Sequence, residues 1–159
     1  MQQNKIGVTG ATGQLGRQVI AHLKKAIPAD QIVALVRDPK KAKDFGVEIR
    51  AFDYTNPEQV AGALKGLSKI LLISSSEIGK RFAQHKNVID GAKKAAIPFV
   101  AYTSILRADV SALGLAPEHK LTEDYLKASG LTYVLLRNGW YIENYTSSLG
   151  NTLKAGAVY

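Results

Sequence analysis

The sequence predicts a doubly wound α/β fold, in which helices cover both faces of a parallel sheet. Short apolar segments alternate with segments of helical periodicity along the 159-residue chain, as in repeated strand–helix units. The apolar segments are nearly continuous, whereas strands with one solvated face alternate polar and apolar residues. A glycine-rich turn directly follows the first apolar segment. We therefore expect one domain over residues 1–159, with the strand order 3-2-1-4-5-6.

In the first half of the chain, turn residues bound the apolar runs and set the limits of each element. The first helix has an apolar stripe that begins at Leu15 and reaches Leu23, and Pro28 marks its end. Asn56 is expected to cap a later helix that has Pro57 at its first position. The expected elements are the strand Ile6–Thr9, the helix from Leu15, the strand Ile32–Val36, a short helix or turn at Lys40–Asp44, the strand Val47–Phe52 and the helix Pro57–Leu64.

The second half continues the alternation without a repeat, a linker or a low-complexity block. The expected elements are the strand Ile70–Ile73, the helix Gly79–Ala96, the strand Phe99–Thr103, the helix Pro117–Ala128 and the strand Thr132–Arg137. The last residues, Ala155–Tyr159, have the pattern of the beginning of a further strand.

The formal net charge of +8 does not predict a nucleic-acid site. No run of five or more basic residues occurs, and the lysines and arginines fall mostly on expected helices and their turns. A nucleic-acid binder gathers basic residues on one face, often with interleaved aromatic side chains. We prefer the interpretation as a solvated basic surface and expect no nucleic-acid partner.

The residue types that the chain lacks exclude several kinds of chemistry. Cysteine is absent, which removes thiol nucleophiles, thiolate metal ligands and disulfides, and is compatible with a reducing cytosol. No apolar run approaches the roughly 18 residues of a membrane-spanning helix, and no signal peptide precedes the first strand. We expect a cytoplasmic chain with no membrane span and no metal site.

The segment from Thr9 to Gly16 carries the most informative spacing. Gly10, Gly13 and Gly16 follow the pattern G-x-x-G-x-x-G between a strand and a helix, a variant of the dinucleotide-binding fingerprint. The first glycine permits a tight turn, the second lets the backbone approach a pyrophosphate, and the third allows close helix–strand packing. The helix that follows directs its unpaired N–H groups and the positive end of its dipole at the phosphates. A purely structural glycine turn is the alternative.

The residue that ends the second strand indicates which dinucleotide binds. An acidic side chain there would accept hydrogen bonds from the ribose 2′-hydroxyl of NAD, but this chain has Arg37, which can pair bidentately with a 2′-phosphate. Lys40 and Lys41 could add positive potential, whereas the adjacent Asp38 is unfavourable to a phosphate. The sequence favours NADP(H) over NAD(H), and an arginine in a surface turn is the alternative.

Polar and aromatic residues follow the other strands, at the sheet edge where ligands of such folds bind. Asp53 and Tyr54 end the third strand, where adenine is expected, and Ser74, Ser75 and Ser76 end the fourth, near the nicotinamide. The sixth strand leads into an aromatic-rich loop that could wall a flat ring or, alternatively, close an edge of the core. The residues of that loop are Asn138, Gly139, Trp140, Tyr141, Ile142 and Glu143.

Together these segments resemble the bacterial type-2 NAD(P)H:quinone oxidoreductases, which are NmrA-like members of the atypical short-chain dehydrogenase superfamily. The resemblance covers nearly the whole chain, and its most specific part is Asn138–Tyr141. It implies a Rossmann domain that contacts NADPH through Gly10–Leu15, Arg37, Ser74–Ser76 and Asn138–Glu143. It also implies quinone reduction over the exposed face of the nicotinamide.

The chain departs from the family's pattern at two places. The segment Pro39–Gly46 is shorter than the family's, which trims a surface helix away from the site. Family members also continue into a smaller C-terminal lobe that helps to close the substrate pocket. On this basis the chain is expected to contain the cofactor half, with the substrate lobe largely absent. An incomplete edge of this kind invites pairing with a second copy, as a homo-oligomer.

The proton donor of typical short-chain dehydrogenases is missing from the sequence. Ser104 stands at the usual serine position, but the Tyr-x-x-x-Lys pair is not present, since Tyr125 is followed four residues later by Ser129. A ketone needs such a donor as hydride arrives, whereas a quinone delocalises the added charge. The pattern therefore favours direct hydride transfer to quinones.

Two residues of the helix Pro117–Ala128 are candidates for a catalytic role. His119 or Lys120 could supply a proton or polarise an oxygen, and the alternative for each is a solvent-facing side chain on the first helical turn. His22 and His85 are expected to be structural or solvated. A second functional hypothesis stays open, because NmrA-like proteins can bind the cofactor without turnover and act as redox sensors or partner-binding regulators.

Overall fold

The fold is a parallel sheet of six strands with helices on both faces. In the computed structural model, which describes residues 4–146 and 148–156, the strand order is β3-β2-β1-β4-β5-β6 and neighbouring strands are parallel. The predicted fold class and strand order are confirmed. The order reverses between β1 and β4, which leaves a crevice at the carboxyl ends of these strands, where doubly wound folds bind ligands.

The elements alternate along the chain as its periodicity predicts. The strands are β1 (Lys5–Thr9), β2 (Ile32–Val36), β3 (Glu48–Ala51), β4 (Leu67–Leu72), β5 (Phe99–Ile105) and β6 (Thr132–Asn138). The α-helices are α1 (Gln14–Ala26), α2 (Pro57–Ala63), α3 (Arg81–Lys94), α4 (Ala116–Lys127), α5 (Glu143–Thr146) and α6 (Leu149–Ala155). The short 3₁₀ helices η1 (Ala29–Gln31) and η2 (Pro39–Ala42) flank β2.

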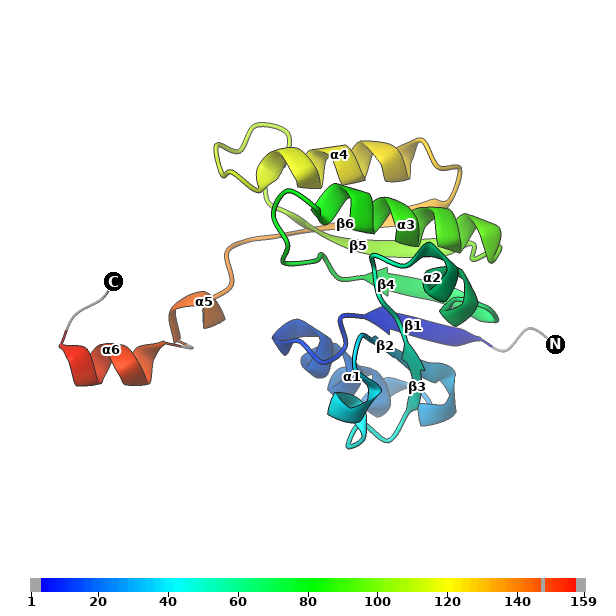
Figure 1. Cartoon of the computed structure of the whole chain (residues 1–159), viewed down its shortest axis with the longest axis horizontal. Coiled ribbons are helices and arrows are strands. Elements are labelled where there is room, and N and C mark those ends of the chain that lie inside the picture. Colours follow the sequence, from blue (N-terminus) through cyan, green and yellow to red (C-terminus); the bar gives the residue numbers. More distant parts are fainter. Residues whose placement is uncertain (1–3, 147, 157–159) are drawn as a thin grey trace.

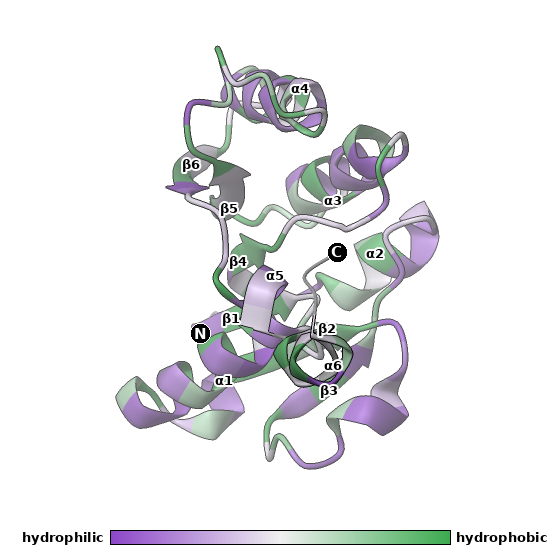
Figure 2. Cartoon of the chain, turned by 90° about the vertical axis from the view of Figure 1, so that its left-hand side faces the viewer, coloured by the Kyte–Doolittle hydropathy of each residue, from purple (hydrophilic) through white to green (hydrophobic). Residues whose placement is uncertain are grey.

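Two hydrophobic clusters hold the layers together, one on each face of the sheet. Figures 1 and 2 show α2, α3 and α4 over one face and α1 over the other. Leu64 and Ile89 belong to the cluster under α2–α4, and Ile20 and Phe45 belong to the cluster on the α1 side. Strand β2 lies between both clusters and is buried at every residue. This packing fixes the carboxyl ends of the strands relative to one another.

The sequence predicts that helices cover both faces of every strand, but one face of the outer strand β6 is exposed. Leu135 packs against the core and Arg137 pairs with Glu123 of α4, so both face the α4 side of the sheet. Because side chains alternate along a strand, Val134 and Leu136 face the other side, where they are 41% and 39% exposed. In the described part of the chain no helix covers that side of β6 (Figure 2).

Several element boundaries differ from the prediction for local reasons. Strand β4 begins at Leu67 rather than Ile70, because Leu67 pairs with Lys5 even though polar residues follow it. Helix α3 lies inside the predicted bounds, since Gly79 and Ala96 have φ values of 84° and 53°, which no α-helix contains. Strand β3 covers Glu48–Ala51 and is two residues shorter than the expected Val47–Phe52. The expected cap on α2 is confirmed, because the side-chain oxygen of Asn56 accepts the N–H of Gln59 at 3.0 Å.

The residues expected to start a further strand end a helix instead. Ala155 is the last residue of α6, and Gly156 follows with a left-handed φ of 67°, a common helix C-cap. The strand prediction is wrong at these two positions, and residues 157–159 lie outside the described residues. Figure 1 shows α5 and α6 extending from the sheet on the side where the strands end. Over the ranges that the structure covers, none of the helices has the length and hydropathy needed to span a bilayer.

Candidate cofactor site

The glycine turn after β1 closes as its spacing predicts. Gly10 has a φ of 57°, and the N–H of Gly13 donates to its carbonyl oxygen at 2.9 Å. A Cβ on Gly16 would lie 2.3 Å from that same oxygen, so only glycine lets α1 pack this close to the turn. No side chain caps the start of α1, which leaves its first N–H groups directed at the crevice.

A buried hydrogen-bond cluster braces this turn against the neighbouring strands. The hydroxyl of Tyr54 lies 2.8 Å from Thr9 Oγ1 and 2.8 Å from the carbonyl oxygen of Ile73. The N–H of Ile73 in turn donates to Thr9 Oγ1 at 2.9 Å. Burial raises the pKa of Tyr54, so the phenol is neutral. The cluster joins the ends of β1, β3 and β4 and holds the crevice open at a fixed width.

The turn opens into a cavity of about 290 Å³ between the carboxyl ends of the inner strands, referred to below as the first cavity. Of the predicted cofactor residues it is lined by Gly10, Thr12, Gly13, Arg37, Ser74, Ser75 and Ser76. Asp53, Tyr54 and Gln84 also line it. Ala11 is buried within the turn, whereas Gln14 and Leu15 line a separate hollow with Tyr141 and Glu143.

Arg37 is exposed at the first cavity and forms no ion pair within residues 4–146 and 148–156. The neighbouring Asp38 is not among the residues that line this cavity, and its carboxylate accepts the N–H of Lys40 at 3.0 Å and caps η2. Lys40 and Lys41 are exposed but do not line the cavity. Hydrogen bonds from Thr55, with a smaller effect of the Arg37 charge, hold the pKa of Asp53 below its ordinary value.

Side chains of α3 hold the peptide of Ser75 from both sides. The N–H of Ser75 donates to Nε2 of His85 at 3.0 Å, and Nε of Arg81 donates to its carbonyl oxygen at 2.8 Å. Ser75 Oγ and Gln84 Oε1 are buried at the first cavity and have no partner among the described residues. Buried polar atoms are normally paired, so these two fit the hydroxyl and amide groups of a bound dinucleotide.

His85 is buried and structural. Because its Nε2 accepts from Ser75, its Nδ1 donates to Oγ1 of Thr122 at 3.0 Å, and that hydroxyl donates to the carbonyl of Glu118 at 2.8 Å. Burial, and then the nearby His119 and Arg81, lower the pKa of His85 to about 3. A chain of neutral hydrogen bonds therefore runs from α4 to the loop at Ser75.

A second cavity of about 270 Å³ shares the three serines with the first. It is also lined by Arg81, Ser104, Ile105, Leu115, His119, Asn138, Gly139, Trp140, Tyr141 and Asn144. His119 is only 3% exposed, so it is not the solvent-facing side chain of the alternative interpretation. Lys120 points away from both cavities and pairs with Asp124 on the surface of α4, and Ile142 is 67% exposed.

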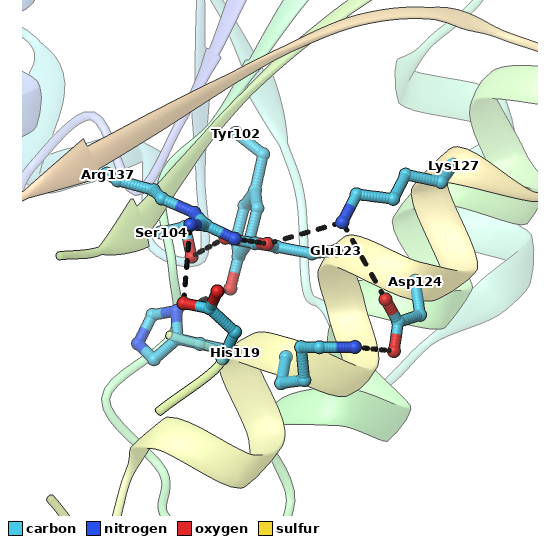
Figure 3. Close-up of polar contacts among 9 residues, drawn as sticks. Tyr102, Ser104, His119, Glu123, Asp124, Lys127 and Arg137 are labelled. Atoms are coloured by element: carbon cyan, nitrogen blue, oxygen red, sulfur yellow. Dashed lines mark hydrogen bonds and ion pairs between the residues drawn. The ribbon is translucent and has the colours of Figure 1, made fainter. Parts of the chain in front are cut away.

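The serine at the end of β5 is engaged by a buried carboxylate. Ser104 Oγ donates to Glu123 at 2.7 Å, and Arg137 donates to the same carboxylate at 2.9 and 2.6 Å (Figure 3). Burial opposes ionisation of Glu123, but these hydrogen bonds hold its pKa below the ordinary value. A carboxylate can only accept, so the proton of Ser104 is committed to Glu123.

Two residues of α3 that line these cavities, Arg81 and Gln84, are absent from the sequence-based prediction, and His85, which is expected from the sequence to be structural or solvated, is buried beside them. The sequence gives only a weak signal for them. They are polar residues on the same buried face of α3 as Val88 and Ile89. Polar residues in the first turns of a helix indicate a site only when the side of the helix that faces the sheet is known.

A doubly wound parallel sheet, a glycine turn before the first helix and paired cavities at the reversal of strand order define a dinucleotide-binding Rossmann domain. Residues 10–157 match the family model described as NAD(P)H-binding. The chain belongs to this NAD(P)H-binding family.

The relatives agree with the resemblance seen in the motifs, which is confirmed. Quinone oxidoreductase 2 of Escherichia coli is 54% identical over 95% of this chain and 54% of its own length. The structure of an NADPH-dependent quinone oxidoreductase from Escherichia coli, complexed with NADPH, has a TM-score of 0.89 at 54% identity, covering 95% of this chain and 54% of that one. Triphenylmethane reductase of Citrobacter sp., complexed with NADP(H), gives 0.90 at 40% identity, covering 97% and 56%. The chain spans about half the length of the curated relatives it matches.

Proposed function

We propose that this chain binds NADP(H) at the carboxyl edge of its sheet and takes part in the reduction of quinones by direct hydride transfer. The observation that carries the proposal is that two cavities meet at Ser74–Ser76. The glycine turn and Arg37 line the first, and the aromatic loop Asn138–Tyr141 lines the second. A dinucleotide with its phosphates in the first has room for a flat ring in the second. The quinone oxidoreductase relatives support this choice of reaction.

We propose further that NADP(H) is preferred over NAD(H). Arg37 can pair with a 2′-phosphate because no carboxylate in the described ranges already occupies it, and Asp38 is directed to η2. Bound NADPH would supply the hydride. Ser75 and Gln84 would bind its hydroxyl or amide groups, and the loop Asn138–Glu143 would exclude water from the reacting ring.

The reaction needs no Tyr-x-x-x-Lys pair when the acceptor is a quinone. Ser104, which stands where a short-chain dehydrogenase would place its serine, cannot donate to a substrate because Glu123 holds its proton. A ketone would leave a strongly basic alkoxide without a proton donor, whereas a hydroquinone anion is a weak base. The site therefore suits quinones.

Steady-state oxidation of NADPH with a simple benzoquinone tests the proposal. We expect strong stimulation over a reaction without protein, no turnover with a ketone of similar size, and unchanged turnover in the control variant Lys120→Ala. Cofactor binding without any turnover would overturn the enzyme proposal. It would support instead the second candidate, a non-catalytic NADP(H)-binding redox sensor or regulator. This candidate is also consistent with the bond from Ser104 to Glu123, which leaves the serine no proton to donate to a substrate.

A further inference from the structure

One contact beside the second cavity is not explained by packing alone. Tyr102 of β5 is fully buried, and its hydroxyl lies 2.7 Å from Nδ1 of His119 on α4 (Figure 3). Thr122 Oγ1 also lies beside this hydroxyl, but its proton goes to the carbonyl of Glu118, it accepts from His85, and no bond of hydrogen-bond geometry joins it to Tyr102. The hydroxyl of Tyr102 and the imidazole of His119 therefore form an isolated pair.

Counting protons fixes the state of this pair. If the phenol donates to Nδ1, the proton of the ring lies on Nε2, and His119 lines the second cavity, where a ligand or water can accept it. If Nδ1 carries the proton and donates to the phenol, the phenol's own proton is fully buried and makes no hydrogen bond among the described residues, at a cost of about 1–3 kcal/mol. Burial raises the pKa of Tyr102, so the phenol keeps that proton. His119 therefore accepts at Nδ1 and carries its proton on Nε2.

The charged and titratable groups around His119 keep it neutral. Arg81 and His85 face it from α3, and Glu118 and Glu123 lie on its own helix. Burial and then Arg81 lower the pKa of His119 to about 4, against the smaller opposite effect of the two glutamates. The ring is therefore a neutral N–H donor at physiological pH and does not become an imidazolium.

The free N–H faces ligand space. His119 lines the second cavity, and its Nε2 has no protein partner in the described ranges. Figure 3 shows the ring with its second nitrogen turned away from Tyr102. Ser104 lines the same cavity, but its proton goes to Glu123. His119, unlike Ser104, therefore has a proton left to donate into this cavity.

We propose that His119 is a catalytic hydrogen-bond donor to the substrate oxygen that gains charge, and that Tyr102 is the positioning residue that fixes its tautomer. This inference rests on the proposed quinone reduction. Hydride leaves the cofactor with the electron pair of its C–H bond, the quinone is reduced, and NADP⁺ is formed. The negative charge on the hydroquinone oxygen is stabilised by the N–H of His119, and water supplies the final proton. His119 keeps its own proton, so acceptors with weakly basic reduced anions are selected.

The kinetic test compares three variants with benzoquinone as acceptor. His119→Leu is expected to lower kcat about tenfold with the KM for NADPH unchanged, because one hydrogen bond to a developing charge is lost. His119→Gln, whose amide N–H can occupy the Nε2 position, is expected to recover most of that loss. Tyr102→Phe should fall between the two. Unchanged kcat in His119→Leu, or a wild-type rate that rises as pH falls through the pKa of an imidazolium, would overturn the proposal.

A measurement on the nitrogen nuclei separates this inference from the proposed function. Imidazole ¹⁵N NMR of the full chain is expected to show His119 protonated at Nε2 only, and a mixture of tautomers in Tyr102→Phe. Addition of NADP⁺ and tetramethylbenzoquinone should shift the Nε2–H signal even if no turnover occurs. A proton on Nδ1, or an Nε2–H signal that this pair leaves unmoved, would overturn the donor role independently of any activity.

Discussion

At Gly16 the absence of a side chain allows α1 to approach the glycine turn that follows β1. A Cβ there would meet the carbonyl oxygen of Gly10 at 2.3 Å and the Cα of Ala11 at 2.6 Å. Both are backbone atoms, which move only if the turn itself moves. This position therefore tests whether the shape of the turn matters to the fold and to the cofactor at once.

Gly16→Ala is expected to lower the free energy of unfolding by about 1–3 kcal/mol, because the added methyl overpacks the turn, and to weaken NADPH binding. Gly62→Ala in α2 is the matched control, since nothing lies within 4 Å of its added Cβ and alanine favours a helix by about 0.5–1 kcal/mol. Urea denaturation and NADPH titration measure both effects. A Gly16→Ala chain as stable as the wild type would contradict the close packing described here.

The two buried histidines make the fold sensitive to mild acid. The pKa of His85 is lowered from 6.5 to about 3 and that of His119 from 6.5 to about 4. Below pH 6.5 the unfolded chain therefore binds protons at these two histidines that the folded chain does not bind. Stability is therefore complete above pH 6.5 and is lost as pH falls toward the folded values. Each histidine can contribute a slope of up to about 1.4 kcal/mol per pH unit.

Denaturation measured between about pH 7 and about pH 5 separates these histidines from the carboxylates, which titrate lower. His85→Gln keeps an acceptor for the N–H of Ser75 and cannot titrate, so it should flatten the pH dependence. His22→Gln, at an exposed position of α1, should leave it unchanged. Equal slopes in wild type and His85→Gln would show that His85 does not stay neutral in the fold.

At the scale of elements, one carboxylate of α4 fixes the start of α3. Glu118 accepts the N–H groups of Gly79 at 3.0 Å and Phe82 at 3.3 Å, and it pairs with the buried Arg81 at 3.5 Å. Arg81 in turn holds the carbonyl of Ser75. The position of the loop Ser74–Ser76 therefore depends on how α4 packs beside α3.

Glu118→Ala is expected to lower the free energy of unfolding by about 3 kcal/mol, because the guanidinium of Arg81 is left buried without its charge partner. Cofactor affinity should fall with it. Asp124→Ala on α4 is the matched control, since its pairs with Lys120 and Lys127 are exposed and contribute little to stability. If both variants lose the same stability, Glu118 is not the link between α3 and α4.

The regular elements could be predicted from the sequence because their signals are local. Strand β2 is apolar throughout and is buried throughout, and Pro57 and Asn56 mark the start of α2. The start of β4 could not be predicted, because Ser68 and Lys69 break the apolar run and only pairing with the neighbouring strands β1 and β5 makes this segment a strand. Tertiary contacts decide such boundaries.

The residues of the candidate site also divide into those that local sequence signals predict and those that only tertiary packing determines. Arg37 and Ser74–Ser76 could be predicted, because they directly follow strands and the carboxyl ends of parallel strands meet at one edge. Arg81 and Gln84 could not, since their inward direction depends on how α3 packs against the sheet. His119 could be named as a candidate, but its burial and its bond to Tyr102 appear only when β5 and α4 are packed together.

At the scale of the whole molecule, the exposed side of β6 predicts self-association. Val134 and Leu136 are 41% and 39% exposed on an outer strand, and apolar outer strands pair with other chains. We expect sedimentation velocity to show a larger species as concentration rises, and Val134→Lys with Leu136→Lys to abolish it. Leu121→Lys, at a 50% exposed site on α4, is the control. A wild-type chain that stays monomeric at every concentration would contradict this expectation.

In the proposed function, the carboxyl edge of this sheet binds NADP(H) through the glycine turn and Arg37. Isothermal titration of wild type and Arg37→Ala with NADPH and with NADH tests it most directly, with the exposed Lys41→Ala as control. We expect the wild type to bind NADPH more tightly than NADH. Arg37→Ala should lose about tenfold to a hundredfold in affinity for NADPH alone, because its hydrogen bonds between charged groups are lost. Equal affinities of the wild type for the two cofactors, or equal losses in Arg37→Ala, would contradict it.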